Sequence, residues 1–207
     1  MENEIKTHYN YQEIIMWIEQ KGIELYGNHF KILESDYQII YKLIAYFLKD
    51  EPTCFQNNIN LNKGILLSGP IGCGKTSIMN IMKYLTPTEH KFFVKPCRDI
   101  SFEFIQDGYQ IIHKYSKGKL YEFEPKTICF DDLGTESNLK YYGNECNVMA
   151  EILLSRYDVY IAKRIQTHIT TNLSASEIET QYGNRVRSRM REMLNLIAYD
   201  KTTSDKR

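Results

Sequence analysis

The chain has 207 residues, of which 43% are hydrophobic and 25% charged, and its 26 basic and 26 acidic residues give a formal net charge of zero. This length allows one well-buried domain with at most a modest extension. The balanced charge excludes a protein that binds polyanions through bulk charge, so any contact with nucleic acid must come from a local basic patch.

The cysteines and the apolar runs indicate the compartment. Five cysteines are widely spaced, odd in number and without a CxxC pair. This pattern argues against a zinc site or a disulfide framework and favours reduced thiols. No apolar run approaches the roughly 18 residues that span a membrane, and the acidic, polar start at residues 1–4 is unlike a signal peptide. We therefore expect a cytoplasmic protein with no membrane contact.

Two helices are predicted before the first strand. Apolar residues recur at roughly helical spacing over 11–26, and Gly22 and Gly27 are expected to interrupt or end this helix. The second helix carries one apolar stripe from Tyr37 to Phe47. Together they predict an N-terminal helical arm over residues 1–50.

The ends of the second helix have their own signals. Ser35 and Gln38 form its expected capping box. Pro52 stops it, because proline cannot continue the helical hydrogen-bond ladder. The polar, asparagine-rich segment 53–63 is expected to be a loop.

Strands and helices alternate through the rest of the chain. Short apolar runs predict strands, and the stretches between them predict helices; the strands are expected at 64–68, 91–95, 127–131, 167–171 and 194–199, and the helices at 76–85, about 99–115 and about 145–163. This alternation predicts an α/β fold of three layers, with a central parallel five-stranded sheet covered by helices on both faces. We assign residues 51–207 to this domain.

A complete GxxxxGK[ST] motif follows the first strand and opens a helix. The expected nucleotide-binding residues are Gly69, Pro70, Ile71, Gly72, Cys73, Gly74, Lys75, Thr76 and Ser77. Glycines let the backbone curl so that successive N–H groups point at phosphate oxygens, and the following helix adds its positive N-terminal end. The motif predicts that the chain binds ATP.

Three side chains of this loop have separate expected roles. Lys75 reaches the β- and γ-phosphates, and the Thr76 hydroxyl ligates Mg²⁺. Cys73 occupies a variable position of the motif, so a passive small residue is a better interpretation than a redox group.

A second apolar strand ends in two carboxylates, Asp131 and Asp132. In P-loop enzymes such a strand runs beside the P-loop strand, and its first acid, here Asp131, holds the Mg²⁺ shell. Asp132 is placed to orient or deprotonate the attacking water, although it is one methylene shorter than the glutamate usual in hydrolytic proteins. Glu136 lies four residues on and is a second acid that could assist.

The stretch Phe130-Asp131-Asp132-Leu133-Gly134-Thr135-Glu136 resembles the "DDLG" region of the helicase-loader and transposition-helper branch of AAA+ ATPases, the DnaC-type and IstB-type proteins. Two later segments, 167–173 and 182–190, resemble that branch's sensor-1 strand and the helix that carries its arginine finger. The resemblance covers about 64–200 and implies an AAA+ base domain.

The resemblance also implies roles for single residues. Asn172 would be sensor 1, which hydrogen-bonds the γ-phosphate or the lytic water. Arg189 would be the finger that reaches the ATP of a neighbouring subunit, and Arg185, one turn earlier on the same helical face, is the second candidate. His168, on the same strand, is expected to be structural.

The chain also departs from the pattern of typical AAA+ proteins. The polar segment 201–207 is too short to form a helical lid, so we expect no lid domain and no sensor-2 arginine. The branch that the chain resembles is known for a reduced lid. Residues 1–33 are expected to form at most a small docking element.

Two segments are weaker candidates for ligand contacts. Residues 27–32 precede the first strand, where the adenine usually lies in this fold, although they could equally be a plain loop. Residues 113–119 form the densest basic run and enclose Tyr115, a composition suited to single-stranded DNA. A solvated helix end is the rival interpretation, because lysine is favoured there.

The leading hypothesis is an ATPase that forms a homo-oligomer on DNA and acts with a replicative helicase or a transposition partner. The first alternative is a nucleotide-dependent adaptor with little hydrolysis. The second is a small-molecule P-loop kinase, but between the acidic strand and residue 160 only Arg156 could serve its lid. A GTPase is excluded because no NKxD motif is present.

Overall fold

The computed structural model describes residues 9–118, 124–136, 139–141, 144–203, 205 and 206. Five strands form one parallel sheet in the order β2-β3-β6-β1-β7. Their bounds are Gly64–Ser68 (β1), Phe93–Pro96 (β2), Ile128–Leu133 (β3), Thr167–Thr171 (β6) and Leu194–Ala198 (β7). All five carboxyl ends therefore meet at one edge of the sheet, where ligands bind in open α/β folds.

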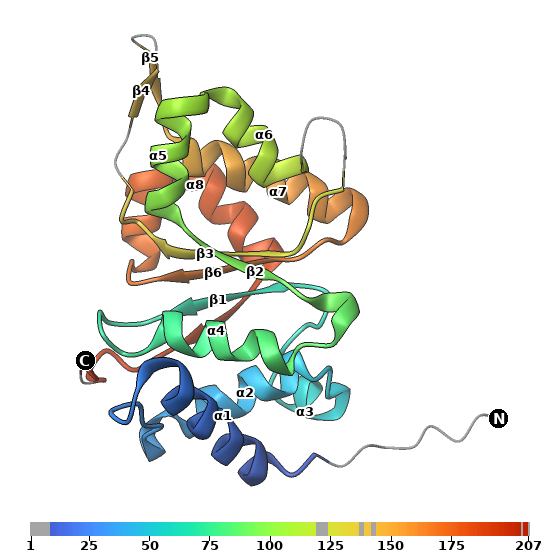
Figure 1. Cartoon of the computed structure of the whole chain (residues 1–207). Coiled ribbons are helices and arrows are strands. Elements are labelled where there is room, and N and C mark those ends of the chain that lie inside the picture. The colour runs from blue at the N-terminus through green and yellow to red at the C-terminus, as the bar shows by residue number, and fades with distance from the viewer. Residues whose placement is uncertain (1–8, 119–123, 137–138, 142–143, 204, 207) are drawn as a thin grey trace, which may run out of the picture.

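One face of the sheet is covered by the N-terminal helices and the helix that follows β1, as Figure 1 shows. These are α1 (Tyr11–Tyr26), α2 (Tyr37–Phe47), α3 (Glu51–Gln56) and α4 (Lys75–Leu85). Ile18 of α1 and Leu43 of α2 lie in the same core as Ile65 of β1 and Met79 of α4, and all four side chains are fully buried. The helical arm thus shares its core with the sheet.

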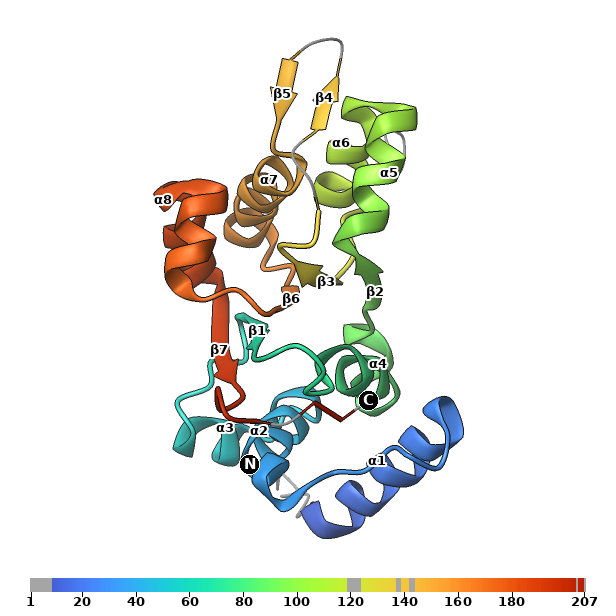
Figure 2. The ribbon, with the colours of Figure 1, turned by 90° about the vertical axis from the view of Figure 1, so that its left-hand side faces the viewer.

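The other face is covered by four later helices (Figure 1). These are α5 (Cys97–Asp107), α6 (Tyr109–Lys117), α7 (Val148–Lys163) and α8 (Ala175–Met193). Their core includes Phe104, Phe130 and Ile169. A two-stranded hairpin, β4 (Leu139–Tyr141) and β5 (Asn144–Cys146), projects beyond these helices in both views (Figure 2). The predicted three-layer α/β fold with a parallel five-stranded sheet is confirmed.

The N-terminal segment agrees with the sequence in its helices and differs at their ends. Gly27 ends α1 with φ of 94°, but Gly22 lies inside the helix, where the Phe30 ring leaves no room for a Cβ. The predicted capping box of Ser35 and Gln38 is wrong. A 3₁₀ turn over Glu34–Asp36 precedes α2, and the Asp36 carboxylate accepts from the Leu33 N–H at 3.2 Å.

Two predicted segments need correction. The prediction of a loop over 53–63 is wrong at its start, because α3 begins at Glu51 with Pro52 in its first turn, where proline is tolerated. The single helix expected over about 99–115 is two helices, α5 and α6. They are separated by Gly108, whose φ of 60° cannot continue a helix.

Among the described residues, no helix combines the length and the apolar character that crossing a membrane requires. The described residues after β7 hold no helix either. They run back over the carboxyl edge of the sheet, where the Lys206 N–H donates to the Gly72 carbonyl at 3.1 Å.

Candidate nucleotide-binding site

The loop between β1 and α4 has the backbone conformation that phosphate binding requires. Gly72 and Gly74 have φ of 81° and 93°, which residues with a Cβ rarely adopt. Lys75, the first residue of α4, is buried, and its ammonium donates to the carbonyls of Gly69 and Pro70 at 2.9 and 2.8 Å. A buried cation thus lies within the loop beside the positive end of a helix, a combination that suits an anion.

The acidic strand meets the P-loop through Thr76. The Thr76 hydroxyl lies 3.0 Å from both carboxylate oxygens of Asp131, which is buried at the end of β3. β6 lies between β1 and β3, so the two strands are second neighbours rather than adjacent. The contact joins the two predicted metal ligands across that gap.

Thr170 of β6 fills the gap and was missed by the sequence analysis. Its hydroxyl donates to Asp131 Oδ1 at 2.6 Å and accepts from the Asp132 N–H at 2.8 Å. Its position two residues before Asn172, on the strand compared with sensor 1, is the only signal that marks it. Thr170 therefore orients the carboxylate of Asp131 and the backbone of Asp132 together.

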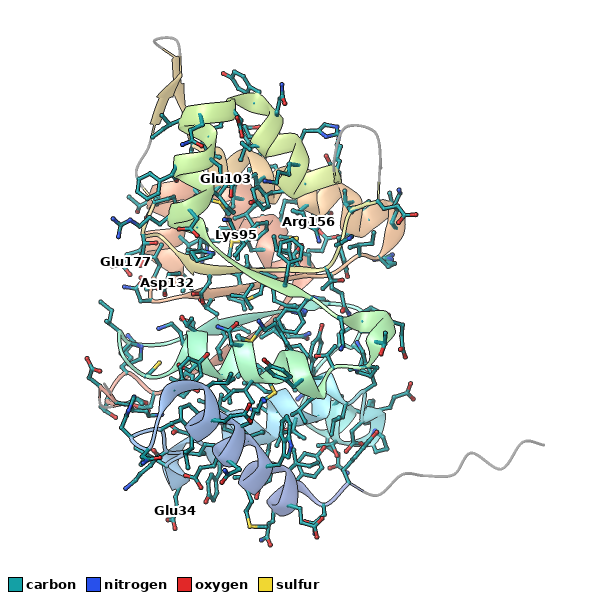
Figure 3. The ribbon with its side chains drawn as sticks, viewed as in Figure 1. Glu34, Lys95, Glu103, Asp132, Arg156 and Glu177 are labelled. Carbon is teal, nitrogen blue, oxygen red and sulfur yellow. The ribbon has the colours of Figure 1, made fainter. Side chains whose placement is uncertain are left out.

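A bulge separates the roles of the two acids. Phe130 pairs with Ile169 and Leu133 with Thr171, so the β3 side of this ladder has an extra residue. Asp132 takes φ of 54°, a left-handed conformation, and is exposed whereas Asp131 is buried. Bulges redirect side chains at functional edges of sheets. Here the side chain of Asp131 is buried and that of Asp132 is exposed. Figure 3 shows Asp132 at this edge.

Burial raises the pKa of Asp131 above its ordinary value, because the charged form loses its hydration. The nearby Asp132 acts in the same direction, and the hydrogen bonds from Thr170 and Thr76 and the charge of Lys75 oppose it. A cation at this carboxylate would relieve the same electrostatic cost.

A cavity of about 470 Å³ borders the P-loop and the end of the acidic strand. Its lining includes most of the predicted site, namely Ile71 to Ser77, Asp132 and Asn172. It also includes residues for which the sequence predicted no role at this site, among them Tyr26, Asp36, Thr135, Tyr199 and Lys206. Residues 29–32 also line the cavity. The segment suggested for adenine thus borders the same space as the P-loop.

The residues present fit Mg²⁺. This ion prefers oxygen ligands and is commonly held by one or two carboxylates together with phosphate oxygens. The Thr76 hydroxyl and the Asp131 carboxylate supply such oxygens side by side. Within the part of the chain that the structure describes, no group of three His, Cys, Asp or Glu residues forms a separate metal cage.

Glu136 is engaged elsewhere. Its carboxylate accepts from the Gly134 N–H at 3.0 Å and from the Tyr182 hydroxyl. Burial and this carboxylate raise the pKa of Tyr182. Glu136 therefore ties the loop after Asp132 to α8 and is not placed as a second catalytic acid.

The two candidate finger arginines differ in their surroundings. The Arg189 guanidinium donates to the Tyr157 hydroxyl at 2.9 Å, lies 4.2 Å from that ring's centre and is 3.6 Å from Glu192. Arg185 is exposed, and the described residues provide no ion pair for it. Neither arginine lines the cavity, and both follow Gly183, which breaks α8 with φ of 86°.

The basic run occupies the end of α6, and Lys119 lies outside the described residues. Tyr115 is buried, and its hydroxyl donates to Glu103, which also pairs with Lys114 at 2.8 Å and with Lys95 (Figure 3). The suggestion that this ring stacks on a base is wrong, because the ring belongs to the core.

His168 is structural, as predicted. It is fully buried, and its Nδ1 accepts from the Ile65 N–H at 3.1 Å. Burial, with the charges of Lys49 and Arg156, lowers the pKa of His168 to about 3. The imidazole is therefore neutral at ordinary pH.

Three solved structures illustrate the similarity of this fold to known proteins. The structure of the DnaC helicase loader has a TM-score of 0.55 and 20% identity, and the match covers 82% of this chain and 92% of that one. For the DnaI structure the TM-score is 0.54 and the identity is 17%, and the match covers 82% of this chain and 87% of that one. For AMPPCP-bound DnaA from Aquifex aeolicus the TM-score is 0.53 and the identity is 15%. That match covers 83% of this chain but only 48% of the DnaA chain.

No protein-family model and no curated protein matches the sequence. At identities of 13–20% the structural likeness establishes the fold alone, and this chain shares its three-layer α/β fold with these solved structures. The fold that the resemblance of the DDLG region implied is thereby confirmed.

Proposed function

We propose that this chain, which has the fold of the AAA+ helicase loaders, binds ATP with Mg²⁺ and hydrolyses it. One observation carries the proposal. The hydroxyl of Thr76 meets both oxygens of the buried Asp131 at 3.0 Å, at the edge of a cavity that Lys75, Asp132 and Asn172 line. A P-loop, an acidic strand end and the polar side chain of Asn172 thus border one space.

Each side chain has one role in the proposed reaction. Lys75 binds the β- and γ-phosphates, and Thr76 and Asp131 hold the metal. Bound Mg²⁺ would neutralise charge on the phosphate oxygens. Asp132 orients the attacking water, and Asn172 hydrogen-bonds that water or the γ-phosphate.

We further propose that hydrolysis needs a homo-oligomer. Arginine stabilises the charge that develops in phosphoryl transfer, and neither Arg185 nor Arg189 lines the cavity of its own chain. A finger from α8 would therefore act on the ATP of a neighbouring subunit.

The process that we propose is DNA replication or the movement of a mobile element, in the cytoplasm, with a replicative helicase or a transposition partner. The similar solved structures support it, because they include a helicase loader and a DNA replication initiation factor. We assign residues 1–50 to a helical arm and 51–207 to the ATPase domain, with the start of the arm as a small docking element.

Single-stranded DNA is the proposed nucleic-acid ligand, and α5 offers a better surface than the basic run. Phe102 is 51% exposed, and the Arg98 guanidinium lies 5.4 Å from the centre of its ring. Exposed aromatic rings and cations bind single strands by stacking and by charge. This pair takes the role that the buried Tyr115 cannot fill.

The test is phosphate release from the purified chain with and without single-stranded DNA. We expect DNA to stimulate hydrolysis, Lys75→Ala to abolish it, and Phe102→Ala to remove only the stimulation. Phe55→Ala is the matched control, since Phe55 is 85% exposed on α3 in the opposite layer. Transfer of phosphate to a small acceptor, or equal rates for Lys75→Ala and the unmodified chain, would contradict the proposal.

A second candidate is an adaptor that binds ATP and hydrolyses it hardly at all. It is favoured by the short Asp132 and by the engagement of Glu136 with Tyr182. ATP binding that Lys75→Ala removes, without phosphate release at any protein concentration, would identify it. The kinase alternative loses support, because Arg156 is buried in the core rather than placed over the phosphates.

A further inference from the structure

Asp36 is a buried acid in the wall of the nucleotide cavity that the proposed reaction does not use. It lies at the end of the 3₁₀ turn before α2 and is 2% exposed. The cavity that it lines also contains Gly72 to Thr76 of the P-loop. A carboxylate is thus buried at the side of the space that we assign to ATP.

The two oxygens of this carboxylate have different surroundings. Oδ2 accepts from the Leu33 N–H at 3.2 Å and pairs with the Lys206 ammonium. Oδ1 is buried and has no hydrogen-bond partner among the described residues. Two donors therefore fix the group and leave one oxygen unused.

An unused buried oxygen has a cost. Buried polar atoms in folded proteins are nearly always hydrogen-bonded. Leaving a buried charged group without a hydrogen bond costs more free energy than leaving a neutral group without one. A carboxylate can only accept. The ligand atom that completes this site must therefore carry an N–H or O–H.

The neighbouring walls suit a flat ring with such a donor at its edge. Phe30, Ile32 and Ile40 supply apolar surface to the cavity, and Tyr199 is buried at its boundary. Nucleotide bases present apolar faces and polar edges, and pockets of this kind fix orientation with few polar groups. The amino group at position 6 of adenine is the edge donor that ATP provides.

We infer that Asp36 Oδ1 accepts a hydrogen bond from the 6-amino group of adenine and so determines the base specificity of the site; this inference rests on the proposed ATP binding. Guanine presents two adjacent donors, which suit both oxygens of a carboxylate. Here Oδ2 is already engaged by Leu33 and Lys206. The single oxygen that remains matches the single amino group of adenine.

The tail after β7 takes part by holding Asp36. Lys206 joins its backbone N–H to the Gly72 carbonyl at 3.1 Å, and its ammonium lies 5.3 Å from the centre of the Tyr199 ring while pairing with Asp36. One residue thus links the P-loop to the carboxylate. Lys206 is a positioning residue in this arrangement.

The test is equilibrium binding of ATP, GTP and purine riboside triphosphate, which has hydrogen in place of the 6-amino group, each with Mg²⁺. We expect the unmodified chain to bind ATP about 10- to 100-fold more tightly than purine riboside triphosphate. Asp36→Ala should bring that ratio close to 1, mainly by weakening ATP. Asp36→Asn, which keeps an oxygen for the Leu33 N–H and puts an NH₂ group in place of Oδ1, should also bring the ratio close to 1, because that group cannot accept from the 6-amino group.

Glu34→Ala is the matched control, because Glu34 is an exposed acid on the same turn (Figure 3) and should leave the ratio unchanged. A ratio near 1 in the unmodified chain, an unchanged ratio in Asp36→Ala, or tightest binding of GTP would overturn the inference. ATP binding that Lys75→Ala abolishes would leave the proposed function intact in those cases. Absence of any nucleotide binding would overturn both.

Discussion

At the scale of single residues, the site depends on hydroxyl groups as much as on acids. The Thr76 hydroxyl contacts Asp131 from the P-loop. The Thr170 hydroxyl contacts Asp131 from β6 and accepts a hydrogen bond from the Asp132 N–H. A third threonine, Thr171, donates to the Leu133 carbonyl at 2.7 Å. These bonds hold the bulge that separates the buried acid from the exposed one.

Thr170→Val tests this arrangement, because it keeps the shape of the side chain and removes its hydroxyl. We expect the hydrolysis rate to fall about 10- to 100-fold, since Asp131 and Asp132 lose their common partner, while ATP still binds. Steady-state phosphate release and equilibrium binding measure the two effects. Thr170→Ser should restore most of the rate, and failure of that rescue would count against a positioning role.

His168 predicts how stability depends on pH. Its pKa is about 3 in the folded chain and about 6.5 when unfolded. Between these values the unfolded chain binds one more proton, so the free energy of unfolding falls as the pH is lowered from about 6.5 toward 3. This single group contributes a slope of about 1.4 kcal/mol per pH unit.

His168→Gln removes that contribution and keeps an acceptor for the Ile65 N–H. Urea unfolding at pH 7, 6, 5 and 4 should show a shallower loss of stability in the variant than in the unmodified chain. Parallel curves for the two proteins would contradict the neutral, buried state of the imidazole.

At the scale of elements, one arginine joins the helical layer above the sheet to the strands. Arg156 of α7 is 1% exposed and donates to Thr167 Oγ1 and to the carbonyls of Ser116, Lys126 and Gln166. Figure 3 shows it beneath this layer. Oxygen atoms from α6, from the segment before β3 and from the start of β6 thus meet at one cation.

Arg156→Met should therefore lower the free energy of unfolding by about 2–4 kcal/mol, because four buried or partly buried acceptors lose their donor. Denaturant unfolding measures the change. Arg164→Met, at an exposed arginine just after the same helix, should change stability by less than about 0.5 kcal/mol. Similar effects of the two substitutions would show that the buried network is not stabilising.

The starts of α2 and α8 show when the local sequence is sufficient to predict how a helix begins. Ser174 and Glu177 form a capping box at the start of α8, with bonds of 3.3 and 2.7 Å, and the sequence signal for it is plain. The similar signal at Ser35 is misleading, because Asp36 forms its contacts with Leu33 and Lys206 instead. The contacts of Asp36 with Leu33 and with the distant Lys206 therefore determine that Asp36, and not Ser35, orders this turn.

At the scale of the whole molecule, the sheet separates the nucleotide site from the arginine helix. α4 and the P-loop lie with α1–α3, and α8 lies in the other helical layer (Figure 2). Arg189 is held by Tyr157 and Glu192 of its own chain, whereas Arg185 is exposed. The exposed position favours Arg185 over Arg189, the first candidate from the sequence, for the proposed contact with a neighbouring subunit.

Mixing two inactive variants tests the contact between subunits. Lys75→Ala cannot use its own ATP site but supplies an intact α8, and Arg185→Ala supplies an intact site. We expect the mixture to regain part of the hydrolysis rate that neither variant shows alone, and to lose it on dilution. A mixture that contains Arg189→Ala in place of Arg185→Ala identifies the alternative finger, and no recovery in either mixture would contradict the arrangement.

The sequence by itself determined the layers and the phosphate loop, because strand and helix periodicity and the glycines at 72 and 74 act through local backbone geometry. It also placed Asp131, Asp132 and Asn172 at strand ends that a parallel sheet brings to one edge. Only the tertiary structure decided that Thr170 bridges the acids, that Glu136 and Tyr115 are engaged elsewhere, and that Lys206 reaches Asp36. Those contacts join residues distant in the chain, and no local pattern specifies which side chains meet when the layers pack.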